Sequence, residues 1–170
     1  FLICCPHGIF VLEVKGGRVG CHNGVWQYTN RYGDVTESNE GPFKQAESAL
    51  HGLMTNLRAN LPDRVAAQFS IGYGVIFPDC EWSVSGAEWD AKTVADARGY
   101  KDIERWLEKL FQYWRNKDGG HRHPTAPTLK ELRQYLRPEF EAATPLHVQA
   151  LGAEERIATL TEDQMAMVDV

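Results

Sequence analysis

The sequence lacks the marks of several protein classes, and each absence narrows what the chain can be. Its four cysteines form no CxxC pair, so zinc-binding spacing is missing and reduced thiols are expected. No apolar run approaches the ~20 residues of a membrane helix, which predicts no membrane contact. The apolar start has no basic leader and already carries Glu13 and Lys15, unlike a signal peptide. These absences predict a cytoplasmic protein.

A net positive charge is also missing, and the charge that is present is unevenly distributed. The net charge of −5 argues against a protein that simply coats nucleic acid. Residues 98–137 hold ten Lys/Arg and five Asp/Glu, whereas residues 138–170 hold one Arg and seven acids. The basic stretch is typical of a part that faces DNA, and also of solvated helix faces.

Hydrophobic patterning in the first half of the chain predicts an α/β core. Apolar runs rich in Val, Ile, Phe and Leu flank a Pro-His-Gly turn, which predicts a buried β-hairpin. The predicted strands are residues 1–5, 9–15, 25–28 and 68–77. Residues 29–41 are polar and are expected to form a loop. A helix is expected from Pro42 to about Asn60, because proline suits the first helical position and apolar residues follow at helical spacing.

The second half of the chain predicts helices. Residues 101–116 carry an amphipathic stripe whose aromatic residues have the spacing of a packed face, although such residues can also stack on bases. Residues 117–127 are expected to be an exposed loop, with a His-Arg-His segment that could alternatively contact phosphate. Thr128 and Glu131 have the spacing of a capping box and predict a short helix to about Leu136.

The motif with the clearest chemistry is Glu13-Val14-Lys15, at the polar end of a buried strand. Residues i and i+2 of a strand share a face, so Glu13 and Lys15 are expected to project together. The carboxylate suits a hard cation such as Mg²⁺, which polarises a phosphate and acidifies a bound water. The lysine can orient that water or stabilise the developing charge. The alternative is a surface salt bridge, which such pairs most often form.

The surrounding sequence resembles the nuclease-related domain family of the PD-(D/E)XK, restriction-endonuclease-like class. The resemblance covers residues 1 to about 80 and rests on PHGIFVLEVKGG, VWQY, GPFKQAESALHGL and VIFP, in this order. It implies a mixed sheet with flanking helices, followed by a helical extension. It also implies that Glu13 and the carbonyl of Val14 bind Mg²⁺ or Mn²⁺, that Lys15 is the catalytic lysine, and that Gln45 completes the site. A solvent-facing Gln45 is the alternative.

One departure from the family's pattern affects this site. The first metal-binding Asp of the family belongs at the start of the first hairpin strand, but residues 1–12 contain no acid. We expect an N-terminally truncated chain, with this Asp immediately before Phe1, and little activity from the chain as given. The alternative is a non-catalytic DNA-binding or docking module that keeps the nuclease fold.

Near the other end of the chain, residues 160–164 (LTEDQ) resemble the Q motif of superfamily-one helicases. In those proteins the glutamine reads adenine, which implies that Gln164 contributes to ATP binding. No GxxxxGK[ST] loop is present, so ATP is expected only in a longer protein. A capping box between Thr161 and Gln164 explains the same residues equally well.

Together these patterns predict a metal-dependent nuclease that acts on DNA in repair, processing or defence against foreign DNA. Three parts are expected. They are a nuclease-related domain over residues 1–95, a helical connector over 96–150, and the start of a helicase ATP-binding lobe over 151–170. The expected partners are DNA and a C-terminal helicase domain in cis.

Overall fold

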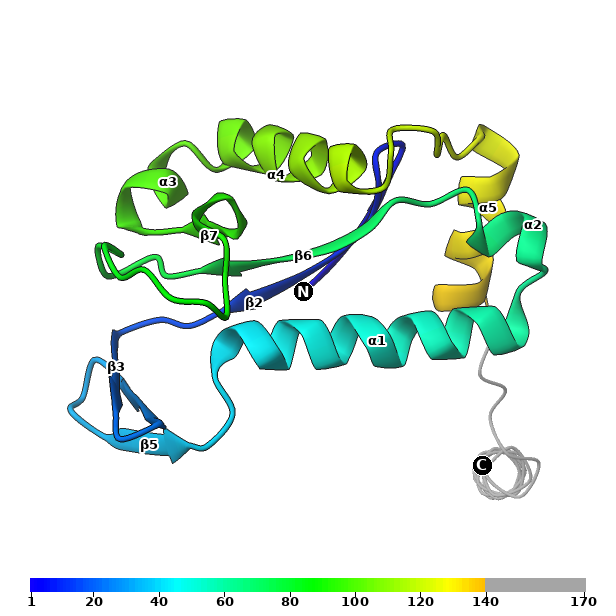
Figure 1. Cartoon of the computed structure of the whole chain (residues 1–170). Coiled ribbons are helices and arrows are strands. Elements are labelled where there is room, and N and C mark those ends of the chain that lie inside the picture. The colour runs from blue at the N-terminus through cyan, green and yellow to red at the C-terminus, as the bar shows by residue number, and fades with distance from the viewer. Residues whose placement is uncertain (140–170) are drawn as a thin grey trace, which may run out of the picture. The chain divides into compact units, whose positions relative to one another are not determined.

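The structure is a computed structural model that describes residues 1–139. Its core is a mixed four-stranded sheet with helices on both faces (Figure 1). The strands of this sheet are β1 (Leu2–Cys5), β2 (Gly8–Val14), β6 (Ile71–Ile76) and β7 (Val94–Ala95). The helices are α1 (Pro42–Asn60), α2 (Asp63–Ala66), the 3-10 turn η1 (Ala91–Thr93), α3 (Ala97–Lys101), α4 (Ile103–Lys117) and α5 (Ala126–Leu136). The predicted α/β class is therefore confirmed.

The strand order of the larger sheet is β1-β2-β6-β7. β1 and β2 form the predicted hairpin, antiparallel and in the register Leu2↔Val11. β2 and β6 pair in parallel, from Ile9↔Ile71 to Val14↔Ile76, and the short β7 adds a second parallel pairing. Alternate side chains of each strand therefore point to opposite faces of the sheet.

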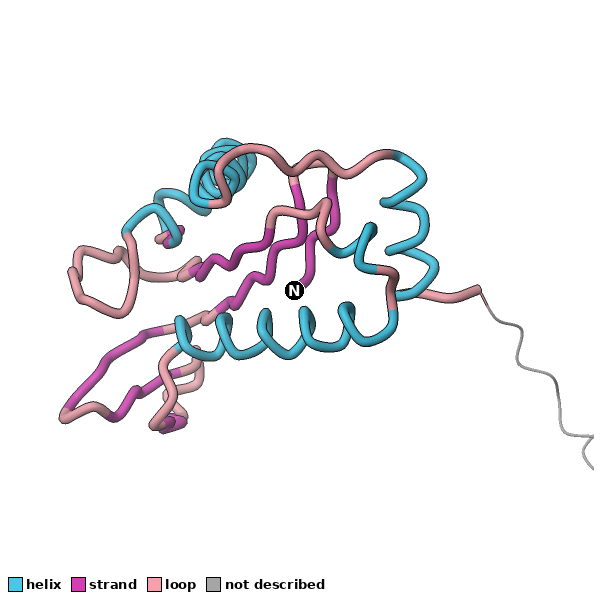
Figure 2. Tube along the Cα trace, turned by 45° about the vertical axis from the view of Figure 1, so that its right-hand side comes forward, coloured by secondary structure: helices cyan, strands magenta, loops and turns pink. Residues whose placement is uncertain are grey.

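α1 covers one face of this sheet, as the two views of the backbone agree (Figures 1 and 2). Ile9 and Val11 of β2 pack there against Leu50, Met54 and Leu57. α1 has the bounds that the sequence predicts, because Pro42 stands at the start of the helix and apolar residues recur on one side. The odd-numbered residues of β2 thus face α1.

α4 covers the opposite face, and two glycines of β6 allow it to approach closely. A Cβ on Gly74 would lie 2.7 Å from Trp106, and a Cβ on Gly72 would meet the indole of Trp114. Trp106 and Leu110 are buried in a cluster with Leu12 of β2. The aromatic stripe is therefore core, as its spacing favours, and the even-numbered residues of β2 face α4.

A second, smaller sheet corrects one expectation. It consists of β3 (Arg18–His22), β4 (Val25–Thr29) and β5 (Val35–Ser38), all antiparallel. β4 is the predicted third strand, but β5 lies in the segment 29–41 that was expected to be a loop. The prediction was wrong there because β5 is almost fully exposed, so its sequence shows no alternation of apolar and polar residues.

The helices after residue 95 belong to the same compact unit as the sheet, which extends over Phe1–Arg137. The expected division of the chain at residue 95, into a nuclease-related domain and a helical connector, stays a prediction. Leu132 of α5 is buried in the cluster beneath α1. α5 also starts earlier than predicted, because its N-cap is Thr125, whose hydroxyl accepts from the backbone N–H of Thr128. Thr128 itself is buried.

Candidate functional site

Glu13 and Lys15 lie side by side at the C-terminal end of β2, on the face that α1 covers. Lys15 Nζ is 2.7 Å from Glu13 Oε1, and the two side chains are 23% and 29% exposed, respectively. Backbone pairing continues past the strand, because the N–H of Lys15 donates to the carbonyl of Ile76. The i, i+2 spacing predicted that the two side chains share a face, and the structure confirms this. The observed ion pair is the arrangement that the sequence offered as the alternative to a metal site.

Tyr28 of β4 reaches this pair from the smaller sheet. Lys15 Nζ lies 4.8 Å from the centre of the Tyr28 ring, a cation–π distance. The Tyr28 hydroxyl is buried and has no hydrogen-bond partner among the described residues. Burial, reinforced by the charges of Glu13 and Cys21, raises the pKa of Tyr28 to about 12. The sequence did not single out Tyr28, because its place depends on how the second sheet folds back.

The β1–β2 backbone pairing of the described residues ends one residue before Glu13. The last β1–β2 backbone bonds join Phe1 to Leu12, in both directions. Because backbone groups alternate between the two neighbours of a strand, the Val14 carbonyl points to the β1 side. Glu13 and Val14 therefore offer a carboxylate and a backbone carbonyl next to each other at the C-terminal end of β2.

Other acids near this end of the sheet are already engaged. Asp79, which follows β6, accepts a 2.7 Å hydrogen bond from the backbone N–H of Gly17. Asp34 accepts from the Asn30 side chain in the turn between β4 and β5. Within residues 1–139, no group of three or more His, Cys, Asp or Glu side chains is placed to share a metal ion.

Gln45 lies in the first turns of α1 and is half-buried. Its side-chain amide donates to the carbonyl of Glu40 at 2.9 Å, so it holds the chain just before the helix. No hydrogen bond between described residues joins Gln45 to Glu13 or Lys15, which leaves its assigned role a prediction. Gln164, expected to read adenine, lies outside the described residues.

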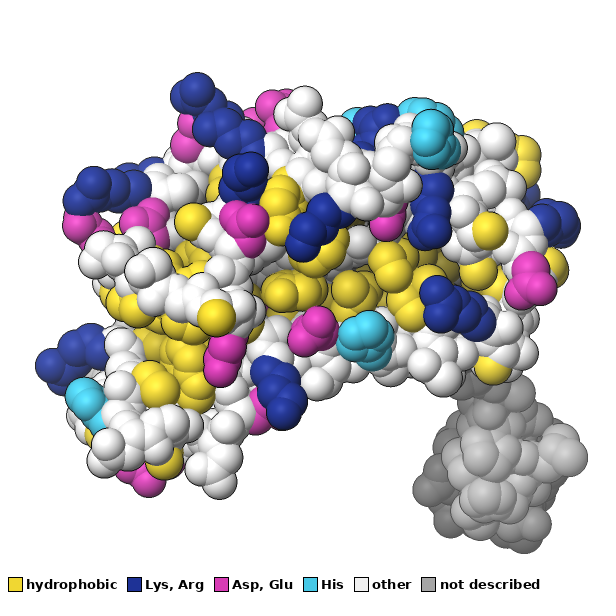
Figure 3. All heavy atoms as spheres, viewed as in Figure 1, with side chains coloured by type: hydrophobic (Ala, Val, Ile, Leu, Met, Phe, Trp, Pro, Cys, Tyr) yellow, Lys and Arg dark blue, Asp and Glu magenta, His cyan; other side chains and the backbone are white. Residues whose placement is uncertain are grey.

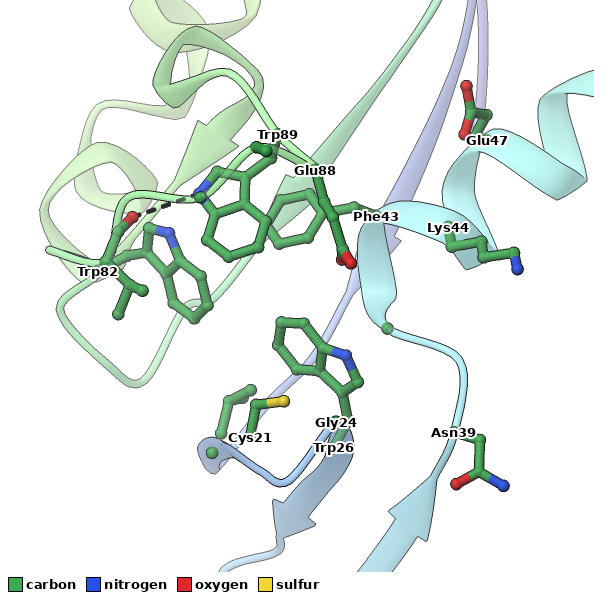
Figure 4. A pocket seen from close by; sticks show the side chains of 16 residues that line it. Cys21, Gly24, Trp26, Asn39, Phe43, Lys44, Glu47, Trp82, Glu88 and Trp89 are labelled. Carbon is green, nitrogen blue, oxygen red and sulfur yellow. Dashed lines mark hydrogen bonds between the residues drawn. The ribbon is translucent and has the colours of Figure 1, made fainter.

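A groove of about 790 Å³ opens between the β3–β4 hairpin, the start of α1 and residues 82–89. Figure 4 shows Trp26, Phe43, Trp82 and Trp89 around it. These rings largely fill one another's space, since the Phe43 and Trp89 rings stack at 4.6 Å. The charged side chains at its rim have mixed sign: Lys44, Glu47 and Glu88. The groove thus shows no preference for an anion or a cation.

The His-Arg-His loop, residues 121–123, is mainly exposed. Arg122 donates to the carbonyl of Phe69, and His123 lies 3.4 Å from Arg115. Arg115 also lies 3.5 Å from His7 in the β1–β2 turn. The loop is therefore tied to the end of the sheet opposite Glu13, far along β2 from the candidate site.

Comparison with protein-family models, with curated proteins and with solved structures gave no match. Among the described residues, none of the helices has both the length and the apolar content needed to span a bilayer.

Proposed function

We propose that the chain is a metal-dependent nuclease domain with a restriction-endonuclease-like core, which hydrolyses phosphodiester bonds of DNA within a larger nuclease–helicase protein. The observation that carries the proposal is the placement of Glu13 and Lys15 on one face, at the C-terminal end of β2. The mixed sheet with helices on both faces supports the proposed core. The helicase partner and its ATP site rest on the sequence of residues 151–170 alone.

The residues present supply part of a metal site for Mg²⁺ or Mn²⁺. A hard cation of this kind takes about six oxygen ligands, usually with one or two carboxylates. Glu13 provides one carboxylate and Val14 one carbonyl. In the antiparallel register, a residue directly before Phe1 would stand opposite Glu13, on the same face and with its Cβ about 5 Å away. An Asp at that place would add the second carboxylate.

Lys15 and Glu13 would have to exchange partners for this site to work. When bound, the cation would polarise the scissile phosphate and acidify a water. Glu13 would turn its carboxylate away from Lys15 to hold the cation, and Lys15 would donate to a phosphate oxygen as negative charge develops there. Opening the pair costs little, because a partly exposed ion pair contributes about 0–1 kcal/mol. The Tyr28 ring supports the Lys15 ammonium in the paired arrangement.

The decisive experiment adds one residue before Phe1. We expect the Asp-extended chain to bind Mn²⁺ and to cut DNA in an EDTA-sensitive reaction. The Asn-extended chain matches it in size and shape but lacks the charge, and is expected to do neither. In the Asp-extended chain, Glu13→Gln and Lys15→Ala should each lower the cleavage rate by orders of magnitude. Equal Mn²⁺ binding by the Asp- and Asn-extended chains would contradict the proposed site.

A second function, a non-catalytic DNA-binding or docking module, is favoured by one observation. No group of three metal-ligating side chains occurs in residues 1–139. This alternative predicts that the Asp-extended chain binds DNA but neither gains Mn²⁺ affinity nor cuts. The same experiment therefore decides between the two functions.

A further inference from the structure

A groove of about 630 Å³ lies between η1 and α4, on the other side of the sheet from Glu13. Three lysines line it: Lys92 from η1, and Lys109 and Lys117 from α4. All three are exposed. In Figure 3, Lys and Arg side chains lie along α4 on the face that is drawn. Lys109 and Lys117 belong to the basic stretch at residues 98–137, so part of that stretch lines a concave surface.

No carboxylate of the described residues lines this groove. Asp90 lies at its margin, where it accepts a 3.1 Å hydrogen bond from the Tyr113 hydroxyl. The backbone N–H of Lys92, together with Tyr113 and the nearby lysines, keeps the pKa of Asp90 below its ordinary value, so this one acid is ionised. Three ammonium groups against one carboxylate leave the groove with a net positive charge.

The remaining lining suits an anion with hydrogen-bond acceptors. Gln112 and Asn116 lie one helical turn apart on α4 and can each donate two side-chain N–H bonds. The ammonium groups of Lys117 and Lys92 lie 5.1 Å and 5.6 Å from the centre of the Tyr113 ring, which itself lines the groove. Trp106 also lines the groove, and its buried indole N–H has no acceptor among the described residues.

We propose that this groove binds the phosphodiester backbone of DNA, with Lys92, Lys109 and Lys117 contacting phosphates. The inference rests on the proposed function for its choice of DNA as the polyanion. Lysine contacts to phosphates release condensed counterions, so they supply affinity without sequence preference. The aromatic groove of Figure 4 is the weaker candidate, because carboxylates stand at its rim. The three lysines would therefore bind DNA without taking part in its cleavage.

The test measures binding of a fluorescein-labelled DNA duplex to the full chain by fluorescence anisotropy, in EDTA and at several salt concentrations. Replacing all three lysines by alanine should weaken binding roughly tenfold or more at low salt. The slope of log affinity against log salt should flatten by about 1 for each lysine removed. Lys130→Ala, an exposed lysine on α5, is the matched control and should change neither quantity.

An affinity and salt slope equal to those of Lys130→Ala would overturn the proposal. So would displacement of DNA by inorganic phosphate beyond that by chloride at the same ionic strength, since this would reveal a site for small anions. Both measurements exclude divalent metal, so they do not depend on cleavage. If the triple variant loses DNA binding while the Asp-extended chain never cuts, only the nuclease proposal fails.

Discussion

Trp114 occupies the space in which any side chain at position 72 would begin. A Cβ built on Gly72 would lie 2.3 Å from Trp114 Cγ, and the indole Nε1 of Trp114 donates to the carbonyl of Tyr73 at 2.8 Å. Neither the indole nor the strand can move without breaking this bond. We expect Gly72→Ala to lower the free energy of unfolding by about 1–3 kcal/mol, the usual cost of overpacking a core. Urea denaturation measures it.

Gly52 provides the matched control. It lies inside α1, is exposed, and has no atom within 4 Å of an added Cβ. Gly52→Ala should therefore stabilise the protein by about 0.5–1 kcal/mol, because alanine loses less backbone freedom in a helix. If Gly72→Ala and Gly52→Ala changed the free energy of unfolding in the same direction, the packing described for α4 would be contradicted.

Replacing Tyr28 by phenylalanine tests the burial of its hydroxyl. At neutral pH, Tyr28→Phe should leave stability unchanged or slightly higher, because the hydroxyl is buried and has no partner among the described residues. A raised pKa means that the folded state holds the phenolic proton more tightly than the unfolded state does. The contribution of the protonated Tyr28 to the free energy of unfolding is therefore fully present below pH 10 and is lost as the pH rises from 10 to about 12.

The wild-type protein should accordingly lose more stability than Tyr28→Phe across this alkaline window. Ultraviolet titration of the phenolates should give the same result, since the difference between the two proteins isolates Tyr28 from the other five tyrosines. A difference curve centred at pH 10, the ordinary value for tyrosine, would show that Tyr28 is solvated.

Asp96 connects α3 to the segment that carries Trp82. Its Oδ1 accepts from the backbone N–H groups of Arg98 and Gly99, and its Oδ2 accepts from that of Trp82. Asp96→Ala should lower the free energy of unfolding by about 1 kcal/mol, as for other N-cap residues. Asp102 begins α4 but makes no side-chain cap bond, so Asp102→Ala should have a smaller effect.

The effect of Asp96→Ala should depend on pH in a stated direction. Backbone N–H groups, first that of Gly99, lower the pKa of Asp96 below its ordinary value of 3.8. A lowered carboxyl pKa adds stability at neutral pH, and this is lost as the pH falls through the folded-state value. Unfolding curves of wild type and Asp96→Ala should therefore converge in acid. A difference that stays constant below pH 4 would show that the carboxylate charge plays no part.

Glu13 and Lys15 should matter little for stability in the chain as given. Glu13→Gln and Lys15→Met should each change the free energy of unfolding by less than about 1 kcal/mol, because the pair is partly exposed. A loss of several kcal/mol from either change would mean that the pair is structural, and would weaken its assignment to catalysis.

Elements that bury one face could be predicted from the sequence. α1 and the β1–β2 hairpin have apolar residues at helical or strand spacing, and Pro42 and the Pro-His-Gly turn mark their ends. β3 and β5 could not be predicted, because most of their side chains are exposed and carry no periodic pattern. The start of α5 was placed three residues late, because both Thr125 and Thr128 have capping side chains and only tertiary packing decides which is buried.

The candidate site, too, could be predicted from the sequence only in part. The common face of Glu13 and Lys15 follows from strand geometry alone, so the sequence predicted it. Tyr28 belongs to another sheet, and its contact with Lys15 depends on a fold-back that no local pattern specifies. The lysine groove joins η1 to α4 across the strand β7 and the short helix α3, so the sequence showed its charge but not its shape.

The parallel pairing of β2 with β6 also has a consequence for how the protein folds. Ile9 lies beside Ile71, so the centre of the sheet joins segments about sixty residues apart. Closing such a loop reduces chain entropy before the contacts within it compensate. β3, β4 and β5 pair only with near neighbours. Refolding should therefore begin with local hairpins and α1, and the β2–β6 contact should form in the slowest step, on a time scale of about milliseconds to seconds.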